Sequence, residues 1–478
     1  MANDPNQGDQ NQSPSPENNL SSNNPKFEKI GVIGVQDTQS NVPIIGEYKA
    51  IGTFKSVQTR GEGKKVELLD ANLIGQAVME DDSIWIGYLG DLDEVFSSEI
   101  KRSDGGEYKV LTDGVSISDD RGVFKYIKRK LLHVFEADAA SKTAAYIAEK
   151  VDKRVMANPG LFVIDKDMNM TKYDSMTEVS GKILLLLHGT LSSTEGSFGD
   201  LKNGDLWKSI HSRYDYVLAL QHYTISVSPI TNVIDILKAL PSNATIDILS
   251  QSRGGLIGDL LCRCDSRNRI KGFSLPEMES LSQDAPEFNN LVKEMNQLAE
   301  LKRLKIGRFV RVASPSSGTS ILGNRLDVYL NAILNLIGMV FGTKANPIFS
   351  AVTEFVMDVL SHRMDARSMP GLWSMVTSST FQKLNNRNDI EVNAERYIIA
   401  GDATIGGSVG NSIMVILTNI YFWRQNDFVV DTNSMNKGLM SVDGYYFYYL
   451  SDISKTNHFN YFKNENSRKA ISMAINGI

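Results

Sequence analysis

The sequence predicts an α/β protein with a mostly parallel central sheet and a helical cap, preceded by a β-rich N-terminal module. Two observations lead to this prediction. From about residue 178 onward, short apolar strands alternate with helical segments, which is the order that builds a parallel sheet covered by helices. Before that point, short β-rich runs recur between glycine, aspartate, asparagine and serine residues, with one helical stretch among them.

Length, charge and cysteine content limit the possible classes of protein. A chain of 478 residues is long enough for two or three domains with large cores. Its 50 Lys and Arg residues against 56 Asp and Glu residues give a net charge of −6, so we expect no nucleic-acid partner bound through bulk charge. The two cysteines, Cys262 and Cys264, exclude a disulfide framework and favour a reducing compartment, so we expect a cytoplasmic protein.

The first 26 residues differ in composition from the rest. Residues 1–26 contain seven Asn and four Pro but only three apolar residues, so they cannot bury enough surface to offset the entropy of ordering. We expect a disordered tail here. The start of the chain shows no basic and apolar signal pattern, and no window of 18 residues is continuously apolar, so we expect neither a secretory signal nor a transmembrane segment.

Residues 27–177 form the predicted β-rich N-terminal module. Its expected strands are Lys29–Val35, Val42–Thr53, Lys65–Leu69, Ile84–Tyr88, Tyr108–Leu111 and Leu161–Ile164. One helix is expected over Ala139–Met156, where apolar residues recur on one face. The module carries no catalytic constellation, and a protein partner is one possible role for it.

Residues 178–478 form the predicted α/β domain. Its strands are expected at Lys182–Leu187, Val217–Leu220, Thr245–Leu249, Arg308–Ala313 and Tyr397–Ala400. The first of these is a solid apolar run, which is typical of a strand covered on both faces. A last amphipathic helix is expected at Glu465–Ile475.

The most informative motif follows the strand at 245–249. Ser250-Gln-Ser252-Arg-Gly254 has the small-x-Ser-x-small spacing of a nucleophile elbow, in which a strand turns so sharply into a helix that larger side chains would clash. Ser250 and Gly254 supply the two small positions, and Gly255 lets the following helix approach the sheet. The motif predicts Ser252 as a nucleophile at the top of an α/β-hydrolase sheet.

A second motif predicts where an oxyanion would be stabilised. The strand at 182–187 ends in His188-Gly189, and α/β-hydrolases place their oxyanion loop after this strand. We expect the backbone N–H of Thr190 or Leu191 to act together with that of Arg253, and losing one such donor typically costs about 3 kcal/mol. His188 itself is expected to shape the loop.

Two further segments supply the predicted acid and base. Asp427 and His458 follow Ser252 in the chain order Ser, Asp, His that α/β-hydrolases use. His458 would take the proton from Ser252, and Asp427 would hold the imidazole in the required tautomer. Asp402, at the end of a strand, and Asp431 are alternative acids. The other candidate bases precede the acid in sequence, which disfavours them: His211, His222 and His362.

From residue 182 onward the chain resembles a lipase-like α/β-hydrolase family of bacteria. The resemblance rests on the motifs LLLHGTLSSTEGSF, LSQSRGG and NDFVVDTNSM, and the last is similar to the segment that carries the catalytic Asp of large bacterial triacylglycerol lipases. The sequence departs from the pattern at Phe428, where a glycine is usual, and at Ser250 and Gln251. The resemblance implies an α/β-hydrolase fold and mechanism without defining a substrate.

An apolar cap is expected at about residues 324–380. Residues 328–341 carry no charge, Asn331 and Asn335 form a narrow polar stripe, and a second helix is expected over Ile348–Leu360. Fourteen residues are too few to cross a bilayer. These helices are either a mobile lid or a fixed cap. In both cases an apolar cap favours an ester or lipid substrate.

The sequence therefore predicts a serine hydrolase of esterase or lipase type, acting through an acyl-serine intermediate. It contains no HExxH, paired CxxC, Walker A or strand-associated GxGxxG pattern, so we expect no cofactor and no metal site. Two alternatives stay open. The hydrolase fold could be an inactive scaffold that binds a partner, or it could serve an acyltransferase or a peptidase.

Overall fold

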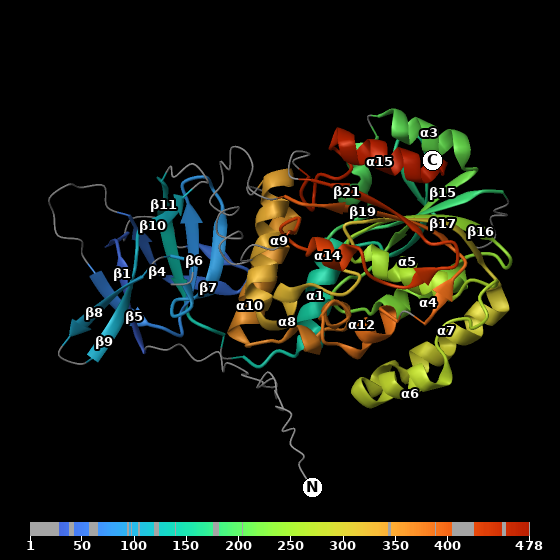
Figure 1. Cartoon of the computed structure of the whole chain (residues 1–478). Helices are drawn as coiled ribbons and strands as arrows, with labels where there is room; N and C mark the ends of the chain where they lie inside the picture. The colour runs from blue at the N-terminus through green and yellow to red at the C-terminus, as the bar shows by residue number, and fades with distance from the viewer. Residues whose placement is uncertain are drawn as a thin grey trace, which may run out of the picture.

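The structure is a computed structural model. It describes residues 28–37, 43–56, 66–92, 95–96, 98–103, 106–118, 124–138, 140–174, 181–202, 204–342, 346–387, 389–403, 425–451 and 456–477. The tail expected at residues 1–26 lies outside the described residues. Figure 1 shows a β-rich N-terminal part and a larger α/β part, with helices α9 (Leu326–Phe341) and α10 (Pro347–Ser361) between them.

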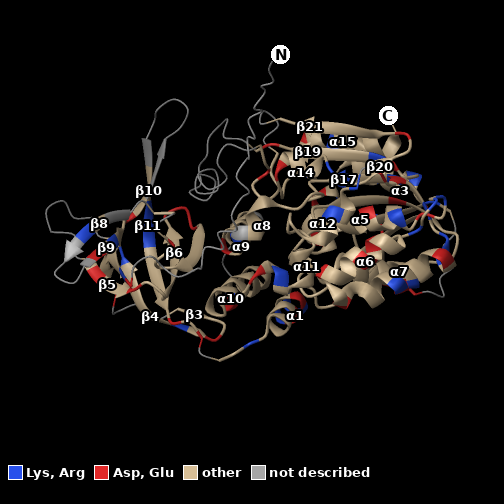
Figure 2. Cartoon of the chain, turned by 60° about the horizontal axis from the view of Figure 1, so that its bottom comes forward, with Lys and Arg blue, Asp and Glu red and all other residues tan. Residues whose placement is uncertain are grey.

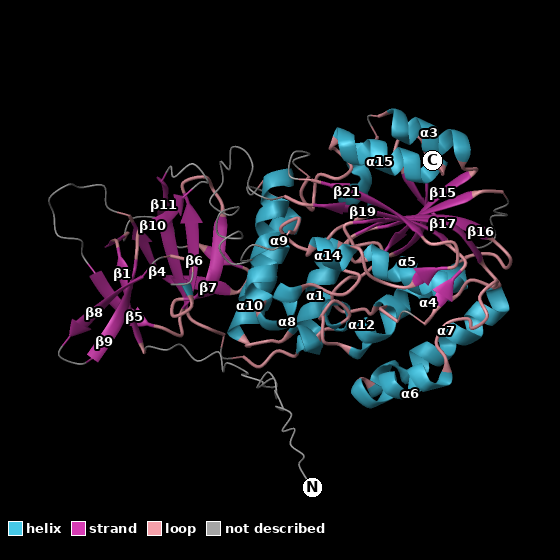
Figure 3. Ribbon diagram, viewed as in Figure 1, coloured by secondary structure: helices cyan, strands magenta, loops and turns pink. Residues whose placement is uncertain are grey.

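The N-terminal part contains two β-sheets (Figure 3). The smaller has the order β5-β1-β9-β8, and the larger has the order β2-β4-β11-β6-β7, with β3 on β4 and β10 on β11. The bounds are β1 Lys29–Ile33, β2 Val35–Gln36, β3 Ile44–Ile45, β4 Tyr48–Lys55, β5 Val66–Asp70, β6 Ile74–Met79, β7 Ile84–Tyr88, β8 Ser98–Ser103, β9 Gly106–Leu111, β10 Gly114–Ser118 and β11 Phe124–Phe135. Buried Ile30, Phe54, Ile74 and Leu132 contribute to the core.

Four of these strands were not predicted from the sequence: β6, β8, β10 and β11. The longest, β11, contains a run of basic residues that is typical of a solvated segment, yet it pairs with both β4 and β6. Arg129 explains how a basic residue fits there. It is buried, and its Nη2 donates to the backbone oxygen of Ile33 at 2.8 Å. A buried guanidinium is tolerated when a carbonyl accepts from it.

The larger part is built on an eight-stranded sheet with the order β13-β12-β15-β14-β16-β17-β19-β21. The bounds are β12 Gly160–Ile164, β13 Met170–Lys172, β14 Ile183–Leu187, β15 Tyr216–Gln221, β16 Thr245–Gln251, β17 Lys305–Val312, β19 Glu395–Gly401 and β21 Tyr445–Leu450. The strands from β14 to β21 are parallel. A separate small pair joins β18 (Glu391–Val392) and β20 (Met440–Ser441).

One sequence-based boundary is wrong. Residues 161–164 were placed in the N-terminal module, but β12 pairs antiparallel with β15 and therefore belongs to the large sheet. β13 pairs with β12 and extends the same edge. The change in composition near residue 178 marks the start of the parallel strands, whereas the sheet itself begins earlier with this hairpin.

Helices cover both faces of the large sheet (Figure 1). One face carries α3 (Asp205–Arg213) and α15 (Glu465–Asn476), and the other carries α4 (Pro229–Ala239), α5 (Gly254–Arg263) and α7 (Asn289–Lys302), with α6 (Leu275–Asp284) farther out. Short helices are α2 Thr194–Phe198, α8 Ser320–Asn324, α11 Pro370–Trp373, α12 Thr380–Asn385 and α14 Thr432–Met435. A β-carbon on Gly258 would lie 2.3 Å from Phe309, so glycine permits α5 to approach the sheet closely.

Two cap helices, α9 (Leu326–Phe341) and α10 (Pro347–Ser361), lie between the N-terminal sheets and the large sheet (Figure 1). Both agree with the predicted cap. Within the described part of the chain, none of the helices combines the length and apolar character needed to cross a membrane. Figure 2 shows α10 beside α1 (Ala144–Val155), the helix that connects the N-terminal sheets to β12.

The contact between α9 and strand β7 explains the polar stripe seen in the sequence. Asn331 Oδ1 accepts from the Ile86 N–H and its Nδ2 donates to the Ile86 carbonyl, both at 2.8 Å. Asn335 makes the same two bonds to Ile84, at 2.8 and 2.5 Å. Four helical residues rise about 6 Å and two strand residues about 6.7 Å. The two amides therefore continue the hydrogen-bond ladder of the sheet edge and cover it.

Charged side chains fasten α10 to the N-terminal part. Buried Asp358 accepts from the Tyr48 hydroxyl at 2.7 Å and lies 3.4 Å from Lys142 Nζ. Glu354 pairs with Lys150 at 2.6 Å and also with Arg154, both on α1. The carboxylates are buried while the cations are partly exposed, so each buried anion has a charge partner.

Replacing both cap asparagines should destabilise the protein. The variant Asn331→Leu/Asn335→Leu keeps similar side-chain volume but leaves four backbone groups of β7 without partners, and each unsatisfied buried group costs about 1–3 kcal/mol. We expect the free energy of unfolding, measured by urea denaturation, to fall by at least about 2 kcal/mol. Asn290→Leu, on an exposed position of α7, is the matched control and should change it by less than about 0.5 kcal/mol. An unchanged urea midpoint in the double variant would contradict this account of the contact.

Candidate active site

The site is built on the turn between β16 and α5. Ser252 follows the last residue of β16 and has a φ of 53°, which is the left-handed region that a residue with a side chain rarely adopts. Its N–H donates to the Val312 carbonyl at 2.9 Å, and its carbonyl accepts from the Gly255 N–H at 2.8 Å. A β-carbon on Gly254 would lie 2.2 Å from the Leu187 carbonyl oxygen. The turn therefore requires a small residue at 254 and directs the Ser252 side chain away from the sheet.

Ser252, His458 and Asp427 lie in one hydrogen-bonded chain. His458 Nε2 is 2.9 Å from Ser252 Oγ, and His458 Nδ1 is 2.8 Å from Asp427 Oδ2. The carboxylate accepts, so Nδ1 carries the proton and Nε2 is left to accept from the serine hydroxyl. All three side chains are buried, with exposed fractions of 3% for Ser252, 3% for His458 and 0% for Asp427.

Asp427 has donors for both of its carboxylate oxygens. Oδ1 accepts from the N–H groups of Val429 and Val430 at 3.2 and 2.9 Å, and Oδ2 also accepts from the Tyr461 hydroxyl at 3.1 Å. These bonds hold the carboxylate in a fixed orientation beside the imidazole of His458. The next residue, Phe428, has a φ of 79°, which explains why glycine is usual at this position of the motif.

The alternative acids have other partners. Asp402 Oδ2 accepts from the Tyr449 hydroxyl at 2.8 Å, and Asp431 Oδ2 accepts from the Ser320 N–H at 3.3 Å. The carboxylate in contact with the imidazole of His458 is Asp427. The geometry therefore favours Asp427 over both alternatives.

The other candidate bases also lie in different surroundings. His211 packs edge-on against Trp207, and the ring nitrogens of His362 contact backbone carbonyls of residues 358 and 140. His222 stacks on His188 with 3.8 Å between ring centroids. The ring within hydrogen-bonding distance of Ser252 is that of His458.

The loop after β14 lies against Ser252. A β-carbon on Gly189 would come within 2.9 Å of the Ser252 β-carbon, so the absence of a side chain permits this approach. The Leu191 N–H donates to Thr224 Oγ1 at 3.0 Å and is not available to a substrate. No acceptor among the described residues takes the N–H of Thr190 or of Arg253. Of the two loop donors that the sequence offered, Thr190 is therefore the better candidate.

The side chain of His188 connects this loop to the loop after β15. Its Nε2 accepts from the His222 N–H at 3.1 Å and its Nδ1 donates to the Gly189 carbonyl at 3.0 Å. Burial lowers the pKa of His188 to about 3, so the ring is neutral at physiological pH. Both nitrogens are used by backbone groups, and the imidazole serves as a rigid bridge between the loops after β14 and β15.

Sequence analysis missed the importance of Gln251 and Tyr461. Gln251 Nε2 donates to the His458 carbonyl at 2.9 Å, and its Oε1 accepts from Ser197 Oγ at 2.7 Å. Tyr461 connects Asp427 to the end of β19, because its hydroxyl accepts from the Gly401 N–H at 2.8 Å. Burial raises the pKa of Tyr461, so its hydroxyl keeps the proton that it donates. The only local signal for Tyr461 was its place three residues after His458.

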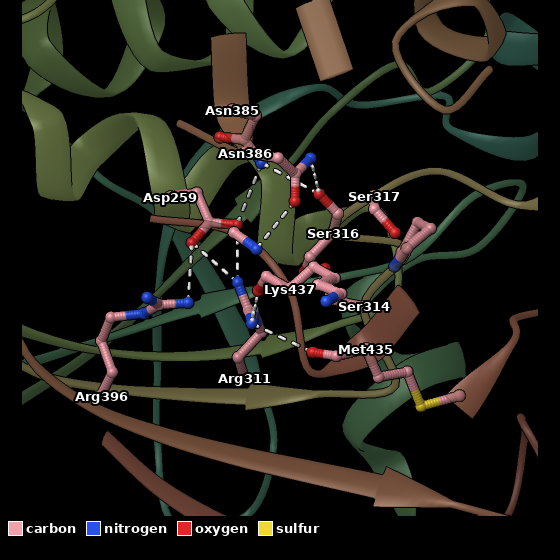
Figure 4. A network of polar contacts seen from close by, with 12 residues as sticks. Asp259, Arg311, Ser314, Ser316, Ser317, Asn385, Asn386, Arg396, Met435 and Lys437 are labelled. Atoms are coloured by element: carbon pink, nitrogen blue, oxygen red, sulfur yellow. Dashed lines mark hydrogen bonds and ion pairs between the residues drawn. The ribbon is translucent and has the colours of Figure 1, made fainter. Parts of the chain in front are cut away.

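A buried ionic network joins the elements on either side of the turn to the segment after Asp427 (Figure 4). Asp259, on α5, accepts from Arg311 of β17 at 2.9 Å through both carboxylate oxygens. Arg311 also donates to the carbonyl of Met435 at 3.0 Å and to that of Lys437. The network therefore connects the helix after Ser252, the neighbouring strand and the segment that follows Asp427. It fixes two parts of the site relative to each other.

The cap closes the site. Thr190 Oγ1 lies 3.7 Å from the sulfur of Met375, and the hydroxyl of Tyr329, on α9, lies 4.0 Å from the same sulfur. A cleft of about 920 Å³ lies elsewhere, between β12, β13 and α4, and Ser252 is not among its lining residues. Ser252 itself is buried, with an exposed fraction of 3%.

The described side chains show no metal centre. Among the residues that the structure covers, no group of three or more His, Cys, Asp or Glu side chains is placed to hold a metal ion. The two cysteines are buried and free.

These features define the class of the protein. A mixed sheet of mostly parallel strands, helices on both faces and a buried serine at a strand-to-helix turn are the architecture of an α/β protein. The chain belongs to the family described as "Domain of unknown function (DUF7379)", which matches residues 157–271 and 289–476. A comparison with curated proteins finds no match.

Several solved structures are similar at low identity. EstA from Clostridium botulinum has a TM-score of 0.40 and 11% identity, covering 68% of this chain and 97% of its own. Lipase 1 from Pelosinus fermentans has a TM-score of 0.40 and 13% identity, covering 62% and 98%. Staphylococcus hyicus lipase has a TM-score of 0.38 and 11% identity, covering 64% and 96%.

The buried neutral His188 predicts a pH effect on stability. Its folded pKa of about 3 is depressed below the usual 6.5, so the unfolded chain alone takes up this proton as pH falls between these values. The contribution of the neutral His188 to the free energy of unfolding is therefore fully present above about pH 6.5. It is lost as the pH falls below that value, by about 1.4 kcal/mol per pH unit for one proton. We expect His188→Gln to reduce the slope of unfolding free energy against pH between about pH 6 and about pH 4. If the plot of unfolding free energy against pH were shifted in the variant but equally steep, the conclusion that His188 is buried in its neutral form would be wrong.

Proposed function

We propose that this chain is a serine hydrolase of esterase or lipase type that cleaves carboxylic ester bonds, most suitably those of acyl lipids. The observation that carries the proposal is the chain of hydrogen bonds from Ser252 Oγ through His458 to Asp427, at 2.9 and 2.8 Å. The left-handed turn at Ser252 and the free N–H groups of Thr190 and Arg253 support it further.

In the first half of the reaction, Ser252 Oγ attacks the carbonyl carbon of the ester. The hydroxyl proton passes to His458 Nε2, and Asp427 stabilises the imidazolium through Nδ1. The carbonyl π electrons move onto oxygen, where the N–H groups of Thr190 and Arg253 would donate to the negative charge. When the tetrahedral intermediate collapses, the alkoxy group takes the proton from Nε2 and leaves as an alcohol, and the acyl group stays on Ser252.

In the second half, water replaces the alcohol. His458 Nε2 accepts a proton from water as its oxygen attacks the acyl carbon, and the same two N–H groups receive the oxyanion. Collapse breaks the bond to Ser252 Oγ, which regains the proton from Nε2. The products are a carboxylic acid and the free enzyme, and no cofactor takes part in either half.

The surroundings of the site support an acyl substrate. Tyr329 and Met375 cover the Thr190 loop, and α9 between Val328 and Leu336 consists of buried apolar side chains except for its two asparagines. Apolar walls of this kind favour hydrocarbon over sugars or phosphates. The substrate and its acyl-chain length belong to this proposal.

The alternatives left open by the sequence predict different experimental results. An inactive scaffold would not react with a serine-directed probe. An acyltransferase would form the same acyl-serine but would pass the acyl group to an acceptor other than water, and a peptidase would prefer an amide. The hydrogen-bonded state of all three side chains argues against a scaffold, because an inactive site has no need to keep them aligned.

We propose three further features of the chain. The chain would consist of the tail at 1–26, a β-rich module and a hydrolase domain that includes β12 and β13. The free thiols of Cys262 and Cys264 support a reducing compartment such as the cytoplasm. A protein partner of the N-terminal module also stays a prediction.

A fluorophosphonate probe tests the nucleophile. We expect the purified full-length chain to be labelled, and Ser252→Ala to abolish labelling, because the probe phosphorus bonds to an activated serine oxygen. His458→Ala should slow labelling by at least about 10³-fold because the members of a triad act as a unit. A detergent series should accompany the assay, since the closed cap restricts access. Wild-type protein that stays unlabelled throughout the series would support the scaffold.

A pair of aspartate variants tests the acid. Asp427→Asn should lower kcat for a p-nitrophenyl ester by about 10⁴-fold, since the amide would favour the wrong tautomer of His458. Asp402→Asn is the matched control, because it changes a buried carboxylate that contacts Tyr449, and it should change kcat by less than about 10-fold. If the two variants lost activity in the reverse order, Asp402 would be the acid.

A further inference from the structure

A buried carboxylate from outside the large sheet holds a loop beside the candidate active site. Asp152, on α1, has an exposed fraction of 2% and points into the loop between β15 and α4. It accepts from the N–H groups of Thr224 at 2.9 Å, Ile225 at 3.1 Å and Ser226 at 2.7 Å, and from the Ser226 hydroxyl at 2.6 Å. Consecutive N–H groups around one anion form a rigid binding nest. Asp152 therefore fixes the conformation of residues 224–226.

Arg253 also binds this loop, at its following residues. Its guanidinium donates to the Val227 carbonyl at 2.5 Å and to Asn232 Oδ1 at 3.0 Å. Burial lowers the pKa of Arg253 to about 10, and the charge of Asp152 opposes this effect. Asp152 and Arg253 are therefore buried groups of opposite charge that bind the same loop, and their attraction reduces the cost of burying either one.

The hydroxyl of Thr224 connects the loop held by Asp152 to the proposed oxyanion loop at 189–191. Thr224 Oγ1 donates to Asp152 Oδ1 at 3.4 Å and accepts from the Leu191 N–H at 3.0 Å. A hydroxyl has one proton, and an ionised carboxylate can only accept. Asp152 therefore orients the hydroxyl so that a lone pair faces Leu191.

The Leu191 contact determines which backbone donor faces Ser252. Leu191 has a φ of 51°, a left-handed conformation that is costly for a leucine unless its surroundings hold it there. With the Leu191 N–H bound to Thr224, the peptide group before it is fixed, and the Thr190 N–H stays without an acceptor among the described residues. The neighbouring peptide group, which carries the Thr190 N–H, is held through the Gly189 carbonyl by His188 Nδ1 at 3.0 Å, so the two contacts fix the loop together.

We infer that Asp152 and Thr224 are positioning residues for the oxyanion hole, with Asp152 acting through Thr224 on the loop at 189–191. The inference rests on the proposed function, because it concerns the donor to the proposed oxyanion. Asp152 lies on α1, before the residues that match the family. Neither residue touches the reacting atoms.

Steady-state kinetics with a short-chain p-nitrophenyl ester tests this inference through two matched variants of Thr224. Thr224→Val keeps the shape but removes the hydroxyl, and Thr224→Ser keeps the hydroxyl. We expect Thr224→Val to lower kcat by about 10- to 100-fold, somewhat less than loss of an oxyanion donor, with KM changed by less than about twofold. Thr224→Ser should recover most of that loss. Asp152→Asn should lower kcat in the same way, and adding Thr224→Val to it should cause little further loss.

Glu354→Gln is the control for helix α1. Glu354 lies on cap helix α10 and pairs with Lys150 and Arg154 of α1 rather than with the loop at 224–226, so kcat should change by less than about twofold. Thermal unfolding of each variant checks folding, and the Thr224 pair decides the test if Asp152→Asn does not fold.

The results separate this inference from the proposed function. An inactive, unlabelled wild-type chain would overturn the proposed function and this inference with it. An active wild type with an equally active Thr224→Val would overturn the positioning role alone. A rise in KM with unchanged kcat, or equal losses in the Val and Ser variants, would overturn it too.

Discussion

The strained turn at Ser252 is the constraint on which the site depends. The turn requires a residue with a side chain to adopt a φ of 53°, and it is stable only because the surrounding strands hold it. The Ser252 N–H binds the end of β17, and Gly254 lies against the end of β14. Because these strands are parallel neighbours of β16, their carboxyl ends meet at one edge of the sheet, and the loops that carry Thr190, Asp427 and His458 converge there.

The sequence could predict the residues whose chemistry needs a fixed type in a local pattern. The motif around Ser252 is marked by its small flanking residues, and the order of Asp427 and His458 in the chain limits the choice of acid and base. The supporting residues carry no such mark. Gln251 looked like a departure from a common histidine, yet it joins His458 to Ser197. Its role depends on two partners far away in the chain, which no local pattern reveals.

The same limit applies to the fold. The apolar strands of the large sheet were predicted because burial on both faces gives continuous runs. β11 was missed because its basic residues are typical of a solvated segment, and only the Ile33 carbonyl explains how Arg129 is buried. β12 was predicted as a strand but placed in the wrong sheet. Its partner, β15, lies more than fifty residues later in the chain, so composition near residue 178 could not place the boundary.

The contacts of the cap determine how the site can open. Movement of α9 as a whole would separate Asn331 and Asn335 from β7 and leave four backbone groups of an edge strand without partners. Movement of α10 would expose two buried carboxylates that pair with α1 and the N-terminal strands. Tyr329 and Thr190 instead contact the flexible thioether of Met375, which can change rotamer at small cost. A change of rotamer at Met375 would therefore break fewer polar contacts than a movement of α9 or α10, which the N-terminal part holds in place.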